Sequence, residues 1–315
     1  MTDLRHFLAD DDLTAAEQTA ILERAEAMKA ARTAEQPLAG PQTVAVIFDK
    51  PTLRTQLSFA TGIAELGGYP MIVDGTLAQI GTRESVADVA RVVGRQASLI
   101  VWRTFAQERL EEMARYAHVP VINALTDDYH PCQLLADLLT VREHKGSTAG
   151  LTLTYLGDGA NNMAHSYLLA CAIAGMHVRV ATPADHWPRA EVIARAERIA
   201  AEQGGSVQVT DDPVAAVTGA DVVATDTWVS MGMEAEEEGR HGEESPFAPF
   251  SVTTELMGHA ADDAIVLHCL PAYRGYEIAA EVIDGPQAVV WDEAENRLHA
   301  QKALMAFLLE HASSA

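Results

Sequence analysis

A polar turn between an apolar run and a helical pattern carries the first residues that could bind a ligand. The run at 44–48 is apolar throughout, and the turn after it presents Thr52, Arg54 and Thr55. Such a turn lies at the carboxyl end of a parallel strand, where α/β proteins bind ligands. Backbone N–H groups of a helix start, together with hydroxyls and a guanidinium, would hold a phosphate. A helix cap with a surface arginine fits the same residues, so this stretch alone leaves both interpretations open.

Two further strand ends carry residues that could act on a carbonyl group. Arg103 and His130 each come just after an apolar run, and Gln133 lies on the helical turn after His130. Because the carboxyl ends of parallel strands lie at one edge of a sheet, we expect Arg103 and His130 at the same edge as Arg54. A positive charge and an imidazole there could polarise a carbonyl oxygen and stabilise an oxyanion. The alternative is that His130 and Gln133 only begin the helix that follows.

A glycine-rich stretch at 156–162 invites a dinucleotide-binding interpretation, which fails at two points. The third glycine position is Asn162, and the strand expected at 177–181 is not followed by the acidic residue that would hold a ribose. A nicotinamide dehydrogenase is therefore disfavoured. Asn162 could instead hold a carboxylate or an amide at the helix start.

The last strand ends carry Asp226, Ser230 and Cys269. Asp226 and Ser230 could together bind an ammonium group. Cys269 could be a nucleophile only with a neighbouring base and a depressed pKa, and the alternative is a cysteine packed at a strand end.

The elements that must position these residues are apolar runs that alternate with helical patterns. This alternation implies right-handed crossovers and parallel sheets covered on both faces. Ten candidate strands exceed what one compact sheet usually holds, so we expect an α/β fold with two doubly wound parallel-sheet domains. The expected strands are 43–48, 70–73, 98–102, 119–125, 151–156, 177–181, 206–210, 221–225, 264–270 and 288–291. The polar segment 145–150 is a candidate domain boundary, and the acidic segment 235–249 should be a long loop.

Composition limits the class of protein. A chain of 315 residues suits two domains, and no apolar run approaches the ~20 residues of a membrane-spanning helix. The acidic start lacks the features of a signal peptide, which predicts a cytoplasmic protein. A formal charge of −23 disfavours binding to nucleic acid or anionic membranes. The cysteines Cys132, Cys171 and Cys269 have no metal-ligand spacing, so we expect no metal site.

Taken together, these stretches resemble the carbamoyltransferase family. Its phosphate motif Ser-Thr-Arg-Thr-Arg corresponds to 52–56 here, and its His-Pro-x-Gln signature corresponds to 130–133. The Ser-Met-Gly loop at 230–232 and the His-Cys-Leu-Pro-Ala stretch at 268–272 narrow the resemblance to the members that act on ornithine. The similarity extends over nearly the whole chain.

The resemblance implies a homotrimer of two-domain subunits with an active-site cleft between the domains. Residues 1–141 would form the domain that binds carbamoyl phosphate, with a C-terminal helix at 298–315 packing back on it. Residues 142–297 would form the domain that binds L-ornithine. No metal or organic cofactor is implied.

Matching the motifs residue by residue assigns the carbamoyl phosphate site. Arg103 would bridge the phosphate and the carbonyl group, while His130 and Thr55 would hold the carbonyl oxygen and Gln133 the carbamoyl nitrogen. Gln79 resembles the residue that is lent to the phosphate site of a neighbouring subunit. The full set is Thr52, Leu53, Arg54, Thr55, Gln79, Arg103, His130, Gln133, Cys269, Leu270 and Arg297.

The same matching assigns the ornithine site and the chemistry. Asn162 would hold the α-carboxylate end, and Asp226, Ser230 and Met231 the α-amino end. Cys269 with the Leu270 backbone would orient the δ-amine, so the resemblance makes Cys269 an orienting group and not the nucleophile. The implied catalytic residues are Arg54, Arg103, His130 and Cys269.

Departures from the family pattern concentrate in the phosphate motif. The family's Ser, Thr and second Arg are Thr52, Leu53 and Gln56 here. Losing the hydroxyl at Leu53 removes a hydrogen bond worth ~1.5–3 kcal/mol to a charged group, so we expect weaker carbamoyl phosphate binding without loss of activity. Tyr273 replaces a His that is usual after 268–272, and the sequence offers no reason for it.

Two alternatives remain at this point. Relatives that act on acylated ornithines also carry Leu at the position of Leu53, although the loop at 230–232 favours ornithine. The altered phosphate motif would also suit a non-catalytic protein that binds carbamoyl phosphate. Against that second alternative stand five intact residues: Arg54, Arg103, His130, Gln133 and Cys269.

Overall fold

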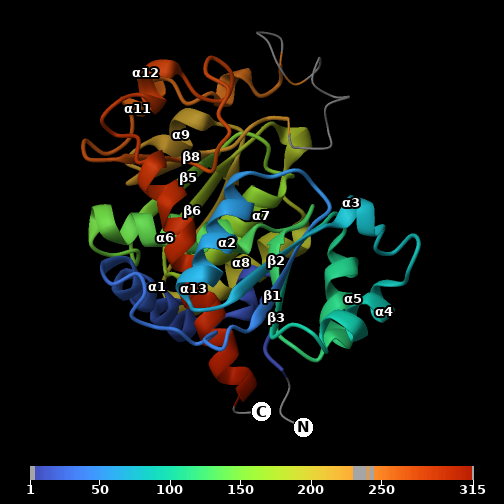
Figure 1. The fold of residues 1–315 in the computed structure, drawn as a ribbon. Coiled ribbons are helices and arrows are strands. Elements are labelled where there is room, and N and C mark those ends of the chain that lie inside the picture. Colours follow the sequence, from blue (N-terminus) through green and yellow to red (C-terminus); the bar gives the residue numbers. More distant parts are fainter. Residues whose placement is uncertain (1–3, 230–239, 241–244, 314–315) are drawn as a thin grey trace. The chain divides into compact units, whose positions relative to one another are not determined.

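The chain forms two compact units, each built around a parallel sheet. A computed structural model describes residues 4–229, 240 and 245–313. The first unit comprises Met1–Leu139 and Glu295–Ala315, and the second comprises Thr140–Ala294 (Figure 1). The chain passes between the units inside helix α6 (Pro131–Lys145) and again inside helix α13 (Val290–Ser313). The polar segment at 145–150 therefore belongs to the second unit.

The first unit has a four-stranded parallel sheet in the order β2-β1-β3-β4. Its strands are β1 (Thr43–Phe48), β2 (Tyr69–Asp74), β3 (Leu99–Arg103) and β4 (Val121–Leu125). At the β4 edge the N-terminal segment adds backbone hydrogen bonds, from Phe7 N–H to the Val121 carbonyl at 2.9 Å and from Asn123 N–H to the Phe7 carbonyl at 2.8 Å. The residues of the other edge strand, β2, are mostly exposed. The N-terminal segment therefore covers the β4 edge of the sheet and not the β2 edge.

Helix α2 packs against the C-terminal helix α13 in the first unit (Figure 1). A Cβ added to Gly62 would lie 3.1 Å from Lys302 Cγ, so the glycine permits this close approach. Lys302 is fully buried, and its ammonium donates to the Arg32 carbonyl and, at 2.8 Å, to Glu65 Oε2. Besides parts of α6 and α13, the described helices of this unit are η1 (Asp10–Asp12), α1 (Ala15–Ala30), α2 (Arg54–Glu65), α3 (Gly75–Ala78), α4 (Val86–Val93) and α5 (Gln107–Ala117).

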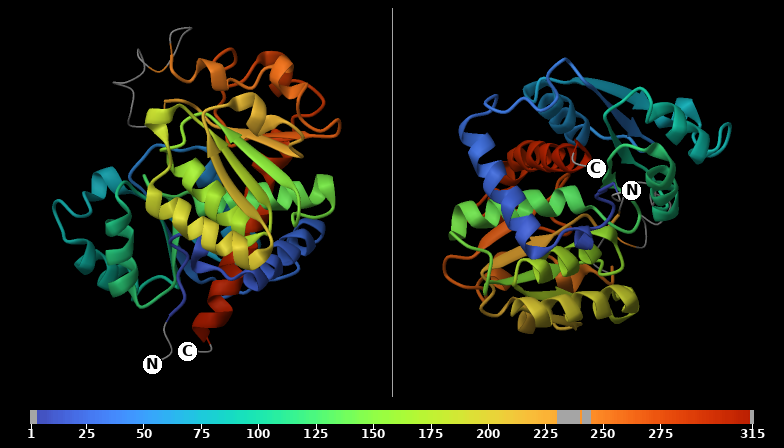
Figure 2. Two further views of the ribbon diagram at one scale, coloured as in Figure 1. Left: turned by 180° about the vertical axis from the view of Figure 1, so that it is seen from behind. Right: turned by 90° about the horizontal axis from the view of Figure 1, so that it is seen from below.

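The second unit has a five-stranded parallel sheet in the order β7-β6-β5-β8-β9. Its strands are β5 (Thr152–Leu156), β6 (His177–Ala181), β7 (Ser206–Thr210), β8 (Val222–Thr225) and β9 (Ile265–His268). Helix α7 (Asn162–Ile173) is buried along its length and lies beside α8 (Ala190–Gln203), which is yellow in Figure 2. The helices are η2 (Ala184–His186), η4 (Ala248–Phe250), α7 (Asn162–Ile173), α8 (Ala190–Gln203), α9 (Pro213–Val217), α11 (Thr254–Met257) and α12 (Ala280–Ile283). The expected α/β class with two parallel sheets is thus confirmed.

The sequence predicts a strand at 288–291, and this prediction is wrong. Ala288 makes an isolated bridge with Val266, and helix α13 begins two residues later at Val290. Asp292 and Glu293 fall in the first helical turn, where carboxylates favour a helix start. The apolar pair at 289–290 is buried against the sheet without joining it as a strand.

Several expectations fall on residues outside the described part of the chain. Ser230 and Met231 lie outside it, as does most of the loop expected at 235–249. Of that loop the structure describes Arg240 and residues 245–249. Among the helices that are described, none is both long and apolar enough to span a bilayer.

The N-terminal segment gives the first unit a pH-dependent contribution to stability. His6 Nδ1 accepts the Val121 N–H at 3.1 Å, and burial lowers the pKa of His6 from 6.5 to about 4. Because the folded pKa is depressed, the unfolded chain binds more protons between these two values. The contribution of neutral His6 is therefore complete above pH 6.5 and is lost as the pH falls to about 4.

We predict that His6→Leu removes this part of the pH dependence. The measurement is the free energy of urea unfolding of both proteins at several pH values. The difference between wild type and variant should shrink as the pH falls from 6.5 to 4. A difference that stays constant over that interval would contradict the assignment to His6.

Candidate active site

The turn after β1, called the phosphate turn here because the resemblance assigns it to a phosphate, leads into α2 without a side-chain cap. Leu53 is the N-cap residue of this helix, and its side chain makes no capping hydrogen bond. Leu53 is 75% exposed. Its apolar side chain cannot form hydrogen bonds, so its backbone N–H is the group that could bind a ligand. Thr52 and Arg54 are half-buried beside it, while Thr55 is buried. The start of this helix therefore offers N–H groups together with Thr and Arg side chains, which suits an oxyanion.

Arg297 joins three helices of the first unit at this position. Its Nη2 donates to Thr55 Oγ1 on α2 at 2.8 Å, and its Nη1 donates to Gln133 Oε1 on α6 at 2.5 Å. The Gln133 amide in turn donates to Asp137 Oδ1 at 2.8 Å. All four side chains are nearly inaccessible to solvent. The structure thus brings Thr55, Gln133 and Arg297 together from positions far apart in the sequence.

Arg103 and His130 complete this first cluster. The pairing of β3 with β4 shifts register between Trp102 and Arg103, and such a bulge redirects the side chain at the strand end. Both Arg103 and His130 are buried. Burial lowers the pKa of His130 well below 6.5, and the positive charges of Arg297 and Arg103 lower it further. His130 is therefore a neutral imidazole at neutral pH, within the electrostatic reach of two guanidinium groups.

Gln79 occupies a different place, on an exposed loop next to the edge strand β2. It ends helix α3 with a positive φ of 50°, and its carbonyl accepts N–H groups from Thr82 and Arg83. Its side chain is exposed. This placement is compatible with a residue that serves a site on another molecule.

Lys50 is a charged residue of this region to which sequence reasoning gave no role. It is buried at the end of β1, with Nζ 2.5 Å from Asp127 Oδ1 and 4.8 Å from the centre of the Phe105 ring. It also borders a hollow of about 280 Å³ lined by Phe48, Lys50, Pro51, Thr52, Gln56, Ile72, Val73, Asp74 and Thr76. Lys50 lies directly before the phosphate motif in the sequence, and this position could have identified it as a candidate site residue.

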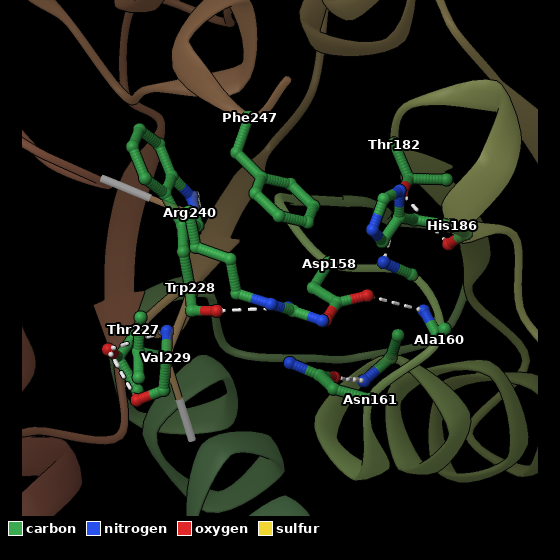
Figure 3. Close-up of polar contacts among 12 residues, drawn as sticks. Asp158, Ala160, Asn161, Thr182, His186, Thr227, Trp228, Val229, Arg240 and Phe247 are labelled. Atoms are coloured by element: carbon green, nitrogen blue, oxygen red, sulfur yellow. Dashed lines mark hydrogen bonds and ion pairs between the residues drawn. The ribbon is translucent and has the colours of Figure 1, made fainter. Parts of the chain in front are cut away.

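In the second unit, the turn after β5 is held by a group of polar contacts (Figure 3). Asn161 caps α7 by accepting the Ala164 N–H at 2.9 Å, and its amide donates to the Tyr155 hydroxyl at 3.0 Å. Asp158 accepts the Ala160 N–H at 3.0 Å and an Arg240 N–H at 2.6 Å. With Asn161 used as the cap, Asn162 stands as the first helical residue, half-buried and at the carboxyl edge of the sheet.

Asp226 and Cys269 meet at the ends of β8 and β9. The Cys269 thiol donates to Asp226 Oδ1 at 3.0 Å, and the Thr227 N–H donates to the same oxygen at 2.7 Å. Burial raises the pKa of Asp226, while His268 and the thiol hydrogen bond oppose that rise. In this arrangement Cys269 is a hydrogen-bond donor, which fits an orienting role better than nucleophilic attack.

His268 shapes the backbone next to Cys269. Its Nδ1 accepts the Leu270 N–H at 2.9 Å, and its Nε2 lies 3.0 Å from Glu277 Oε1. Glu277 Oε1 also accepts the Tyr273 N–H at 2.6 Å. That contact uses the main chain of Tyr273, whose side chain is 44% exposed, so it does not depend on the residue type.

A metal ligand set can be tested against the same residues. Ligand atoms of Asp226, His268 and Cys269 all lie within 4.8 Å of one another. Both ring nitrogens of His268 are already engaged in hydrogen bonds, and the thiol donates to the carboxylate. These contacts would have to break before the three residues could coordinate an ion, so the group fits a metal poorly.

Comparisons with known proteins identify the family. The carbamoyl-P binding domain of aspartate/ornithine carbamoyltransferase matches residues 5–143, and the Asp/Orn binding domain matches residues 149–308. The ornithine carbamoyltransferase of Clavibacter sepedonicus is 64% identical over 305 residues, which cover 97% of this chain and 98% of that protein. The chain belongs to the aspartate/ornithine carbamoyltransferase family.

Solved structures give the same family. The structure of ornithine carbamoyltransferase from Pyrococcus furiosus is 46% identical, with a TM-score of 0.91 and 96% of each chain covered. A structure of acetylornithine transcarbamylase complexed with acetylcitrulline is 32% identical, with a TM-score of 0.86 over 97% of this chain and 99% of that one. Similarity is thus higher to the protein named for ornithine than to the one named for acetylornithine.

We predict that Arg297→Met raises the pKa of His130. The variant removes one of the two positive charges that disfavour the imidazolium, while the effect of burial and the charge of Arg103 remain. NMR of protein labelled with carbon-13 in histidine would follow the titration of the ring. The pKa of His130 should move upward but remain below 6.5. An unchanged or lowered pKa would contradict the electrostatic description of this cluster.

Proposed function

We propose that this protein is an ornithine carbamoyltransferase, which transfers the carbamoyl group of carbamoyl phosphate to the δ-amine of L-ornithine to give L-citrulline and phosphate. The observation that carries the proposal is the buried cluster of Thr55, Arg103, His130, Gln133 and Arg297 at the carboxyl edge of the first sheet. The names of the similar proteins support ornithine as the acceptor. Because citrulline is a precursor of arginine, we also propose a role in arginine biosynthesis.

In the proposed mechanism, the first unit binds carbamoyl phosphate. The helix start at Thr52, Leu53, Arg54 and Thr55 binds the phosphate, and Arg103 bridges the phosphate and the carbonyl oxygen. His130, held neutral by its surroundings, can donate a hydrogen bond to that oxygen. Gln133 holds the carbamoyl nitrogen, and Arg297 fixes Gln133 and Thr55 in place.

The second unit binds and orients the amino acid. Asn162 receives the α-carboxylate end, and Asp226 the α-amino end, with Ser230 and Met231 as further proposed ligands. Cys269 and the Leu270 backbone orient the δ-amine. Leu270 has a positive φ of 58°, and its N–H bond to His268 supports that conformation. A backbone held in this way can present a group to the substrate reproducibly.

The chemical step needs the substrates of both units. The lone pair of the neutral δ-amine attacks the carbamoyl carbon and forms a C–N bond. The tetrahedral intermediate then expels phosphate with the electrons of the C–O bond, and the proton lost by the nitrogen passes to the departing phosphate. Thr55, Arg103 and His130 would stabilise the oxyanion, and losing one such contact typically raises the barrier by ~3 kcal/mol. Holding both reactants in place supplies the orientation term.

The acceptor is tested with purified protein, carbamoyl phosphate and a set of amines. The set is ornithine, lysine, putrescine, N-acetylornithine and N-succinylornithine, and the product is measured by chromatography. We expect rapid turnover with ornithine and little with the others. Turnover only with an acylated ornithine would mean that Leu53 marks a member of the family that acts on acylated ornithines. No turnover with any amine would favour a non-catalytic protein that binds carbamoyl phosphate.

The assembly is also part of the proposal, as a homotrimer in which neighbouring subunits share phosphate sites. Five apolar side chains around the edge strand β2 support a covered surface there, with exposed fractions from 45% to 80%: Leu53, Leu57, Tyr69, Met71 and Leu77. Sedimentation equilibrium should give the mass of three chains. A monomer at micromolar concentration would contradict the shared site.

The proposed location is the cytoplasm. Cys132 and Cys171 are buried, Cys269 is partly buried, and none of the three is in a disulfide. Thiols outside disulfides suit a reducing compartment.

A further inference from the structure

The loop that carries Gln79 is held in an unusual backbone conformation. Gln79 has a φ of 50° and Gly81 a φ of 79°, in the left-handed region that residues with a Cβ rarely adopt. Between them, Ile80 is buried in the core of the first unit. The Gly81 N–H donates to the Glu84 carbonyl at 2.7 Å, which closes the turn. Such a conformation persists only where neighbouring groups fix it.

Arg109, from helix α5, reaches this loop. Its Nη2 donates to the Ile80 carbonyl at 2.8 Å, so a charged donor binds the backbone directly after Gln79. A Cβ on Gly81 would lie 3.2 Å from Arg109 Nη1, so the glycine leaves room for the guanidinium as well as supplying the positive φ. The guanidinium carbon also lies 5.3 Å from the centre of the Trp102 ring on β3.

Asp49 connects Arg109 to the strand ends that carry the phosphate turn and Arg103. Asp49 Oδ2 accepts from Arg109 Nη2 at 3.3 Å and from the Thr104 hydroxyl at 2.6 Å. Its side chain is only 6% exposed. A Cβ on Gly75 would lie 1.9 Å from Asp49 Oδ1, so the carboxylate packs directly against the backbone where α3 begins. One buried carboxylate therefore contacts both ends of the segment from Gly75 to Gly81, directly at Gly75 and through Arg109 at Ile80.

We propose that Arg109, oriented by Asp49, is a positioning residue that fixes the backbone at residues 79–81 and thereby aims Gln79 at the carbamoyl phosphate of a neighbouring subunit. This inference rests on the proposed function and the proposed trimer. It adds a residue that no motif of the sequence singled out. It also gives a physical reason for Arg109, Asp49 and Gly81 to occur together.

The inference predicts a selective kinetic effect. In the described part of the chain, Arg109 donates to the Ile80 carbonyl and to Asp49, and neither residue is assigned to the amino-acid site. Arg109→Met should therefore raise KM for carbamoyl phosphate about tenfold, the effect of losing one charge-assisted hydrogen bond, with KM for ornithine and kcat changed less than about twofold. Arg109→Lys, which retains a charged donor, should recover part of the loss.

A double variant tests whether Arg109 acts through Gln79. Gln79→Ala alone should raise KM for carbamoyl phosphate at least as much as Arg109→Met. If the arginine acts only by aiming the glutamine, the double variant should match Gln79→Ala. Effects of the two changes that multiply would overturn the proposal, and so would a Gln79→Ala variant with normal KM.

The matched control is Arg115→Met, which removes an exposed arginine from the same helix. It should leave both KM values unchanged. An equal rise of KM in this control would mean that loss of positive charge alone explains the effect, which would overturn the role of Arg109.

Hydrogen exchange separates this proposal from the proposed function, because it needs no turnover. The amide N–H groups of Gly81, Thr82 and Arg83 are bonded within the loop. They should exchange at least tenfold faster in Arg109→Met than in wild type, while amides of β1 keep their rate. Unchanged exchange at these amides would overturn the proposal even if wild type makes citrulline. Faster exchange in Arg109→Met, combined with a wild type that makes no citrulline, would show that Arg109 fixes the loop backbone. It would refute only the proposed carbamoyltransferase activity.

Discussion

The buried guanidinium of Arg297 is the interaction on which the arrangement of the first unit depends. It bonds Thr55 on α2 and Gln133 on α6, and both acceptors are neutral oxygens. These two bonds orient the guanidinium group. A buried charge is costly unless an opposite charge or several hydrogen bonds stabilise it. Two guanidinium groups in one cluster, those of Arg297 and Arg103, suit a phosphate dianion. Burial lowers the pKa of His130, and these two charges lower it further.

The second unit uses the opposite electrostatic design. Its candidate site contains the carboxylate of Asp226, which suits an ammonium group, whereas Asp158 already accepts from Arg240. Asp226 is kept in position by the Cys269 thiol and the Thr227 backbone, and Asp158 by Arg240 (Figure 3). The proposed division of substrates between the units fits this difference, with an anion bound near Arg103 and Arg297 and an amino acid bound near Asp226.

The strands are the part of the fold that the sequence predicts best. Nine of the ten expected strands are present in the described part of the chain, because runs of Val, Ile and Leu bounded by polar turns are typical of buried parallel strands. The run at 288–291 failed because its apolar residues are followed by Asp292 and Glu293, which favour a helix start. An apolar run alone cannot distinguish a strand from the first turn of a buried helix.

The site could be predicted only in part, since motifs identify residues and not their partners. Arg297 was assigned by resemblance, but its bonds to Thr55 and Gln133 depend on helix packing that no spacing reveals. Likewise, Arg109 looks like an ordinary helical surface residue in the sequence. Its partner Asp49 lies sixty positions earlier in the chain. Contacts over such separations come from the tertiary structure.

The central claim is that the first unit binds carbamoyl phosphate through the charge of Arg297 and its neighbours. Isothermal titration calorimetry with phosphonoacetamide, which resembles carbamoyl phosphate but cannot transfer its amide group, tests this directly in the absence of any amino acid. We expect binding to wild type, and affinity at least about tenfold weaker for Arg297→Met, the usual effect of losing a charged hydrogen-bonding partner. Equal affinity in the two proteins, or no binding to wild type, would contradict it.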